Sequence, residues 1–414
     1  MLSRRIAIVV FVLVPIVLGR GNALGGGFAI PPQTAKAASL ANAVTAGVDD
    51  PSAVYSNPAA LTEVEGNQIM VGAIYVNTAS GVTNSGRRSV NKHDDDLIPT
   101  LFANYHVPGT QFTLGLGSFT PFGLATSYAP GGFTRFAAIR SELRTAYITP
   151  AVAWRLSSFL SVGGGVSFVH SSALLSRSIF LGGPEARLRI TDTDNGYAYG
   201  LGLLVKPHER LKLGLKYRSR VDLNFDTADV KFGTGPVTST KSKGTQIPLP
   251  PVISMGINWQ INPAWAVEFA YDFTHWSEFK HLKARFSSPL LGGLIPGFFI
   301  PQDWKDTSTL RFGTSYKLQP NLELRGGLGL DETPIPGRTL SPAIPGADWL
   351  TLTGGIGYNW QGLTIDLGYM AVFYKTRRVT NNVLEADLAL PFTPGRDKYE
   401  TFQNLVSLHL RYRF

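Results

Sequence analysis

Alternation of apolar and polar residues is the dominant pattern along most of this chain. In RLKLGLKYRS, the apolar side chains Leu211, Leu213, Leu215 and Tyr217 fall on one side, opposite lysine, glycine and arginine. The stretches AVEFAYDF and GLTIDLGYM repeat the same two-residue period further along the chain. Because successive side chains of a β-strand point to opposite faces, this period predicts strands with one apolar and one polar face.

The connections between the predicted strands alternate strictly in length. The short joins have the sequences HVPGT, RLSSF, KPHER, QINPA, KLQPN and NWQGL. Longer segments lie between them, at residues 120–140, 176–196, 222–247, 286–305 and 331–348. A soluble sandwich has no reason to alternate in this way, whereas outer-membrane barrels have short periplasmic turns and long extracellular loops.

Aromatic residues at the strand ends support a membrane barrel. Tryptophans lie beside the short joins and also at the opposite strand ends, which predicts two interfacial girdles. The first group is Trp154, Trp259, Trp265 and Trp360, and the second is Trp304 and Trp349. The final stretch TFQNLVSLHLRYRF alternates up to an aromatic carboxyl terminus, which is typical of strands that close outer-membrane barrels. About 14 strand candidates can be counted, the even number that such barrels need.

The predicted fold is therefore all-β, a 14-stranded antiparallel transmembrane β-barrel plugged by an N-terminal hatch. Charged residues on the inward faces predict a polar lumen, which needs water or a plug to fill it. Residues 24–66 precede the first strand and are half apolar, yet Pro51 and Pro58 prevent them from joining a sheet. We predict that residues 24–66 form the hatch and residues 67–414 the barrel.

The first 23 residues have the features of a secretory signal peptide. Arg4 and Arg5 are followed by an apolar run from Ile6 to Leu18 and then by small residues. That run is shorter than the roughly 20 residues that a membrane-spanning helix needs, and Pro15 interrupts it. The chain is therefore expected to leave the cytoplasm.

Composition narrows the classes of function. Charged residues make up only 16% of the chain, and the net charge of +9 comes from basic residues dispersed along the sequence. Dispersed charge argues against nucleic-acid binding. The chain has no cysteine, so disulfides and thiolate metal sites are excluded. The glycine runs VGGGVSF and LTGGIGY lack the following Lys-Ser/Thr of a phosphate loop, and the histidines show no metal-ligand spacing. We expect no metal, cofactor or catalytic residue.

Several stretches, in order, resemble the FadL family of outer-membrane long-chain fatty acid transporters, which also includes importers of aromatic hydrocarbons. These are GVDDPSAVYSNPAAL, TPFGLATSY, KYRSRVDLNF, INPAWAVEFAYDFTHWSEFKHLKA and DETPIPGRTLSPAIPGADWLTLTGGIGY. The resemblance implies capture of a hydrophobic molecule at extracellular loops, transfer to a pocket in the barrel, and lateral release through a kink in the third strand. Partners would be long-chain fatty acids or other hydrophobic small molecules, and outer-membrane lipid or lipopolysaccharide, around a monomer in a Gram-negative outer membrane.

The resemblance also implies individual site residues. Pro121, Phe122 and Gly123 match the kink, where a proline and a glycine weaken strand pairing. Asn57, Pro58 and Ala59 match a hatch segment that gates the kink, with Gly123 as its target; the alternative is an ordinary Asn-Pro turn.

Arg177 matches a family arginine that contacts the ligand carboxylate; the alternative is a lumen arginine paired with a barrel carboxylate. A lysine that assists this arginine in other members aligns near Ile300, and its loss favours a less polar substrate. The apolar loop SSPLLGGLIPGFFIP predicts a capture groove; the alternative is simple packing of the loop onto its neighbours. The lining of the groove would be Leu290, Leu291, Leu294, Ile295, Phe298 and Phe299.

Three other functions are consistent with parts of the sequence. Hydrocarbon uptake is the alternative substrate class. An adhesin or phage-receptor barrel without transport is a second alternative, because extracellular loops evolve toward such uses. A barrel hydrolase would use His170 or His409 with a nearby serine, but no spacing supports it.

Overall fold

The computed structural model describes residues 27–92, 95–181, 184–233, 238–290, 295–382 and 397–414. The predicted signal peptide lies outside the described residues. No helix among the described residues is long and apolar enough to cross a membrane.

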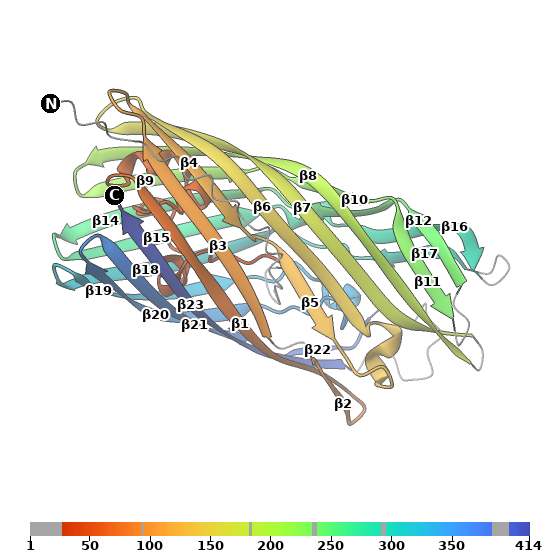
Figure 1. The fold of residues 1–414 in the computed structure, drawn as a ribbon. Coiled ribbons are helices and arrows are strands. Elements are labelled where there is room, and N and C mark those ends of the chain that lie inside the picture. The colour runs from red at the N-terminus through yellow and green to blue at the C-terminus, as the bar shows by residue number, and fades with distance from the viewer. Residues whose placement is uncertain (1–26, 93–94, 182–183, 234–237, 291–294, 383–396) are drawn as a thin grey trace.

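Fourteen antiparallel strands form a closed barrel, which confirms the predicted fold (Figure 1). The third strand of the wall is split in two, and the barrel closes where the last strand pairs with the first, from Gln68↔Arg413 to Asn84↔Asp397. In wall order the strands are β1 (Gln68–Asn84), β3 (Asp95–His106), β4 (Phe112–Phe119) with β5 (Gly123–Ser127), β6 (Arg140–Arg155), β7 (Leu160–Phe180), β8 (Glu185–His208), β9 (Leu211–Arg218), β14 (Val252–Asn262), β15 (Trp265–Thr274), β18 (Thr307–Gln319), β19 (Leu322–Asp331), β20 (Trp349–Trp360), β21 (Leu363–Tyr374) and β23 (Asp397–Arg413).

Side chains alternate between the outer surface and the interior along the last strand, as the two-residue period predicts. On β23, Leu408, Leu410 and Tyr412 are exposed on the outer surface, whereas Ser407 and His409 are fully buried. All six predicted short joins connect neighbouring barrel strands. At the join between β20 and β21, Gln361 and Gly362 both have positive φ, as a two-residue hairpin turn requires.

The hatch fills the barrel from the end that carries the short turns. It consists of α1 (Ala35–Ser39), α2 (Ala53–Ser56), η1 (Pro58–Glu63) and irregular backbone, and nearly all of its residues are buried. Figure 1 shows this red segment inside the barrel near the carboxyl terminus. Prolines keep the hatch out of the sheet, and its apolar side chains form one core with the inner wall.

Smaller elements extend from the opposite, extracellular end. They are β2 (Arg87–Val90), β10 (Val221–Phe225), β11 (Ala228–Gly233), β12 (Thr238–Lys243), β13 (Thr245–Leu249), β16 (His281–Leu290), β17 (Ile295–Pro301), β22 (Arg377–Val379), η2 (Phe133–Phe136), η3 (Trp276–Glu278) and η5 (Gly337–Thr339). β11 pairs with the end of β8, and β12 pairs with β16, so these strands prolong the wall outward.

Two predictions about this end are wrong. Residues 176–196 are not a long loop, because β7 and β8 continue as paired strands up to Phe180↔Glu185. The second tryptophan girdle is also absent at its predicted positions: Trp304 is 3% exposed, and Trp349 packs against the core. By contrast, Trp259 and Trp360 beside the short turns are more than half exposed. Sequence position alone did not distinguish tryptophans facing lipid from those facing inward.

Candidate functional site

The barrel wall has a gap beside residues 120–122, between β4 and β5. Both strands pair with β6, so that side of the wall is continuous. On the other side, β3 pairs with β4 only as far as Leu101↔Ser118, and no pairing between β3 and β5 is found in the described residues. The predicted kink at Pro121, Phe122 and Gly123 coincides with this wall gap. Proline has no backbone donor, which accounts for an interrupted ladder at this point.

An N-terminal strap, Phe28–Gln33, lies across the wall gap from the inside. Gly123 N donates to Phe28 O at 2.9 Å, and Ile30 N donates to Pro121 O at 2.8 Å. Between these two bonds, Ala29 and Phe122 form an antiparallel bridge. The strap therefore supplies hydrogen-bond partners that a neighbouring wall strand would otherwise provide.

Gln33 joins the two edges of the wall gap, one through its side chain and the other through its backbone oxygen. Thr120 N donates to Gln33 Oε1 at 2.9 Å, and Gln33 Nε2 donates to Thr120 O at 3.0 Å. Thr100 Oγ1, on β3, donates to the backbone oxygen of Gln33 at 3.0 Å. The strap thus makes hydrogen bonds to both edges that fail to pair with each other.

Phe28 is the strap's apolar anchor. Its ring lies 4.8 Å from that of Trp276, 5.5 Å from Trp304, and 6.0 Å from both Phe122 and Phe279. Such edge-on aromatic contacts add to the stabilisation from burial. The sequence does not predict this group of aromatic rings around Phe28, because its members come from four separate segments. The prediction that Trp304 faces lipid is also wrong for this reason.

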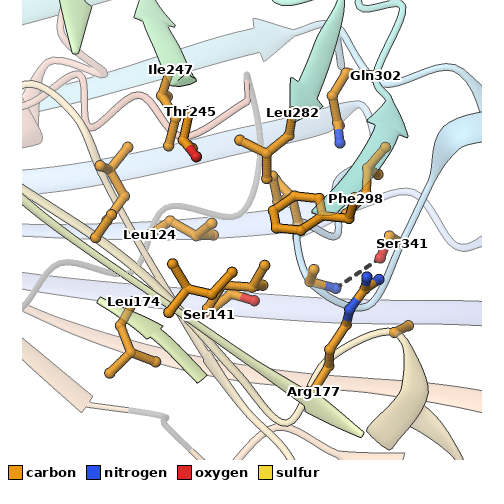
Figure 2. Close-up of a pocket in the computed structure, with 18 of the residues that line it drawn as sticks. Leu124, Ser141, Leu174, Arg177, Thr245, Ile247, Leu282, Phe298, Gln302 and Ser341 are labelled. Carbon is orange, nitrogen blue, oxygen red and sulfur yellow. Dashed lines mark hydrogen bonds between the residues drawn. The ribbon is translucent and has the colours of Figure 1, made fainter. Parts of the chain in front are cut away.

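A cavity of about 360 Å³ lies on the other side of Phe28. Its lining is mostly apolar and includes Leu124, Leu143, Leu174, Ile247, Leu282 and Phe298. Figure 2 shows five of them, Leu124, Leu174, Ile247, Leu282 and Phe298, converging from several strands and loops. Among the buried polar atoms without a hydrogen-bond partner are Ser141 Oγ and Thr245 Oγ1, which belong to lining residues. This volume and mixture of groups fall within the range of small-molecule sites.

Arg177 is the cation of the cavity lining. The side chain is 8% exposed, and its guanidinium lies 5.4 Å from the ring centre of Phe298. Figure 2 shows both at one end of the cavity, near Ser341. Among the described residues no carboxylate lies within ion-pair distance of Arg177, and its Nε has no hydrogen-bond partner. Glu142, which also lines the cavity, is paired with Arg140 and Arg144. The structure therefore does not support the alternative, in which Arg177 pairs with a carboxylate of the barrel.

The predicted capture groove divides into two parts. Phe298 and Phe299 border the cavity. Leu290 is buried in a separate apolar cluster, against which Ile295 packs. Leu291 and Leu294 lie outside the described residues.

The hatch segment Asn57-Pro58-Ala59 lies elsewhere. Asn57 Nδ2 donates to Thr45 O at 2.9 Å and to Leu203 O on β8 at 3.2 Å, and its Oδ1 accepts from Ala59 N. We predicted that this segment faces Gly123, and that part of the prediction is wrong: the residue bonded to Gly123 is Phe28. Asn57 instead makes hydrogen bonds to other hatch residues and to strand β8 of the wall.

Close contact at Asn57 depends on a glycine of β8. A Cβ at Gly202 would collide with Asn57 Oδ1, whereas a Cβ at Gly200 would lie 3.7 Å from its nearest neighbour, Tyr217 O. Gly202→Ala is expected to lower the free energy of unfolding by about 1–3 kcal/mol through overpacking. Gly200→Ala is the matched control, and urea unfolding in detergent micelles measures both. Equal stability of the two variants would contradict the close hatch–wall contact.

Glu63 holds the end of the hatch through three basic side chains of the wall. Lys206 Nζ is 2.6 Å from the carboxylate, Lys212 Nζ 3.1 Å and Arg155 3.6 Å. Burial raises the pKa of Glu63, but Lys206 and Lys212 lower it more, and the net pKa is below the ordinary value. The contribution of this attachment to stability is therefore complete above the unfolded pKa of about 4.3, and it is lost as the pH falls from there through the lower pKa of folded Glu63.

We therefore expect hydrogen exchange at residues 58–64 to accelerate in wild type as the pH falls from 6 to 3, after correction for intrinsic rates. The variant Glu63→Gln should exchange rapidly at both pH values. A pH-independent difference between the two proteins would contradict this account.

Both histidines considered for a hydrolase have other partners in the described part of the chain. Ala35 N donates to His409 Nδ1 at 3.1 Å, so Nε2 carries the hydrogen and donates to Thr100 Oγ1 at 2.8 Å. His170 Nδ1 lies 2.7 Å from Asn195 Oδ1. His409 thus connects the hatch to the same threonine that binds Gln33.

A closed barrel, an internal hatch and an apolar cavity beside a wall gap together define a plugged outer-membrane barrel for small molecules. The sequence model of the family described as outer membrane protein transport protein (OMPP1/FadL/TodX) matches residues 16–414, and the chain belongs to this family. It is located in the outer membrane, as the family is. The resemblance seen in the sequence is thereby confirmed.

Relatives and solved structures agree with this assignment. The long-chain fatty acid transport protein of Escherichia coli is 25% identical over 77% of this chain and 81% of its own length. The 47 kDa outer membrane protein of Pasteurella multocida is 26% identical over 95% of each chain. A Pseudomonas aeruginosa FadL homologue superposes with a TM-score of 0.80, at 20% identity, over 94% of this chain and all of its own. The P. putida toluene transporter TodX gives 0.76 at 19% identity, over 93% and 99%.

Proposed function

We propose that this protein takes up hydrophobic molecules passively, with long-chain fatty acids as the first substrate class. The observation that carries the proposal is that Phe28 borders the apolar cavity and is also hydrogen-bonded to Gly123 at the wall gap. Phe28 thus separates the cavity from the wall gap. When the strap is displaced, the cavity and the wall gap become continuous.

The proposed route begins at the extracellular end. Phe298 and Phe299, which line the cavity, receive the molecule, and the cavity holds its apolar part. The strap then leaves the wall gap, and the molecule passes sideways between β3 and β5 into the membrane. Lateral exit avoids water, where exposure of an acyl chain costs about 0.8 kcal/mol per CH₂.

Arg177 would bind the carboxylate of a fatty acid. A guanidinium presents a rigid set of donors that matches a carboxylate, and this one has no carboxylate partner among the described residues. The rest of the hatch, from Thr34 to Gly66, would close the lumen throughout, held by Asn57 and Glu63. In this proposal the gating role assigned to Asn57-Pro58-Ala59 becomes an anchoring role, and the strap is the moving part.

Neutral aromatic or aliphatic hydrocarbons are a second candidate class. Ile300, near which the lysine of other family members aligns, borders the cavity. A single cation binds a carboxylate less strongly than a pair does, which favours a less polar ligand.

Uptake in a bacterial strain lacking its own transporters tests the proposal. Expression of the chain should restore uptake of labelled oleate, and uptake of labelled toluene would identify the second class. A strain expressing an unrelated porin at equal level is the control. Failure to take up either compound, with the barrel folded and in the outer membrane, would leave the adhesin or receptor role.

A further inference from the structure

Basic residues that are dispersed in the sequence gather on one extracellular surface. Strands β8, β11, β12 and β16 are neighbours in that order in the sheet. Their exposed positions carry seven cations, which we call the outer basic face. It consists of Arg187, Arg189, Lys231, Lys241, Lys243, Lys283 and Arg285.

Strand pairing sets several of these cations directly opposite one another. Lys231 is the register partner of Arg189, and Lys243 is that of Arg285. Like charges in such positions destabilise a sheet. Lys241 is the exception, because its Nζ lies 2.7 Å from the carboxylate of Asp229.

The other six cations have no carboxylate within ion-pair distance among the residues that the structure describes. Glu185 at the edge of the face is already bound by Arg135 at 2.6 Å. A surface that accumulates unpaired charge of one sign at the expense of its own sheet stability is suited to an anionic ligand.

The outer basic face points away from the barrel, toward the surrounding membrane surface. β7 and β8 pair without a register shift from Leu160↔Val205 to Phe180↔Glu185, so the alternation along β8 is unbroken. Arg187 and Arg189 therefore share a face with the exposed Tyr197 and Tyr199 below them.

The opposite side of the same strands is apolar and buried. Leu188, Val230 and Phe286 belong to one cluster there, and it holds the sheet in position. Eight residues separate Arg189 from Tyr197, which corresponds to roughly 20 Å of height for a tilted strand. Figure 1 shows β11, β12 and β16 at the barrel end opposite the carboxyl terminus.

We propose that the outer basic face binds the phosphate groups of lipopolysaccharide. The outer leaflet of this membrane consists of that lipid, whose lipid A and core sugars carry phosphates beside and above the acyl chains. A laterally directed cationic sheet above the lipid-facing residues meets this layer. Lysine and arginine are the side chains that bind phosphate by charge-assisted hydrogen bonds.

Binding of purified lipopolysaccharide to the full-length protein in detergent tests the proposal. The probes are lipopolysaccharide with a phosphorylated core and the same material after chemical dephosphorylation. Two double variants of the outer basic face are compared with wild type. One face variant combines Arg189→Gln with Lys231→Gln, and the other combines Lys243→Gln with Arg285→Gln. The control pair is Arg210→Gln with Lys317→Gln, two exposed cations near the short turns at the opposite end.

We expect each face variant to bind phosphorylated lipopolysaccharide at least tenfold more weakly than wild type, with the control pair within twofold. Wild type should bind the dephosphorylated lipopolysaccharide more weakly than the phosphorylated one, by a similar factor. Because each variant removes a like-charge pair, its unfolding temperature without lipid should equal or exceed that of wild type. This control separates lost binding from lost folding.

Three results would overturn the proposal. They are equal wild-type affinity for both probes, unchanged affinity in both face variants, and wild-type binding to double-stranded DNA as tight as to lipopolysaccharide. The last would indicate a general polyanion surface. None of these results depends on whether the protein transports fatty acids.

Discussion

A disulfide between cysteines introduced by Ala29→Cys and Phe122→Cys is expected to stop substrate uptake. The two residues form a bridge flanked by the hydrogen bonds from Gly123 to Phe28 and from Ile30 to Pro121. That arrangement makes them a non-hydrogen-bonded antiparallel pair, in which the Cα atoms are about 4.5 Å apart. A disulfide accommodates this separation. It would hold the strap on the wall gap and keep the cavity apart from the membrane.

The chain has no cysteine of its own, so the engineered pair is the sole disulfide that can form within it. Uptake of labelled oleate by cells expressing the oxidised double variant should fall at least tenfold, and a reductant should restore it. Each single variant controls for the loss of the Phe122 ring or the change at Ala29. Wild-type uptake through a fully oxidised protein, verified by thiol labelling, would rule out displacement of the strap.

Arg177→Met is expected to reduce fatty acid uptake while leaving hydrocarbon uptake unchanged. A hydrogen bond to a charged group contributes about 1.5–3 kcal/mol, which corresponds to roughly 10- to 100-fold in affinity. Methionine has a similar apolar stem, so packing against Phe298 is largely retained. Because the arginine is buried without a carboxylate partner, its removal should not lower the free energy of unfolding.

The comparison of substrates is the decisive control for Arg177. The rate of oleate uptake at low concentration should fall in Arg177→Met and remain within severalfold of wild type in Arg177→Lys, which keeps the charge. Toluene uptake should be the same in all three proteins. An equal loss for both substrates would mean that Arg177 shapes the cavity rather than binds a carboxylate.

Much of the fold could be predicted from the sequence because its signals are local. The period of two assigns strands, and the short turns and long loops orient them in the membrane. Pro51 and Pro58 mark a segment that cannot join the sheet, and that segment is the hatch. The weakness in the wall at Pro121 is likewise a property of the residue itself, since proline lacks the donor that a strand pair needs.

The candidate site was predicted less completely, because its parts are close only in the folded chain. Arg177 was singled out, and it does border the cavity with Phe298. The strap was missed, since nothing in Phe28–Gln33 indicates which strand it will bond. Trp276 escaped notice and Trp304 was placed on the lipid face, because inward and outward tryptophans look alike near strand ends.

The sequence by itself determined a plugged barrel in the outer membrane, because alternation, turn length and proline position act within a few residues. Only the tertiary structure decided that Phe28 lies between the cavity and the wall gap, and that scattered lysines and arginines form one outer basic face. Both depend on strand register and on barrel closure, which bring together residues far apart in the chain, such as Phe28 and Trp304 or Ala35 and His409. Such proximity is set by the summed packing of the whole wall and leaves no trace in any short stretch of the chain.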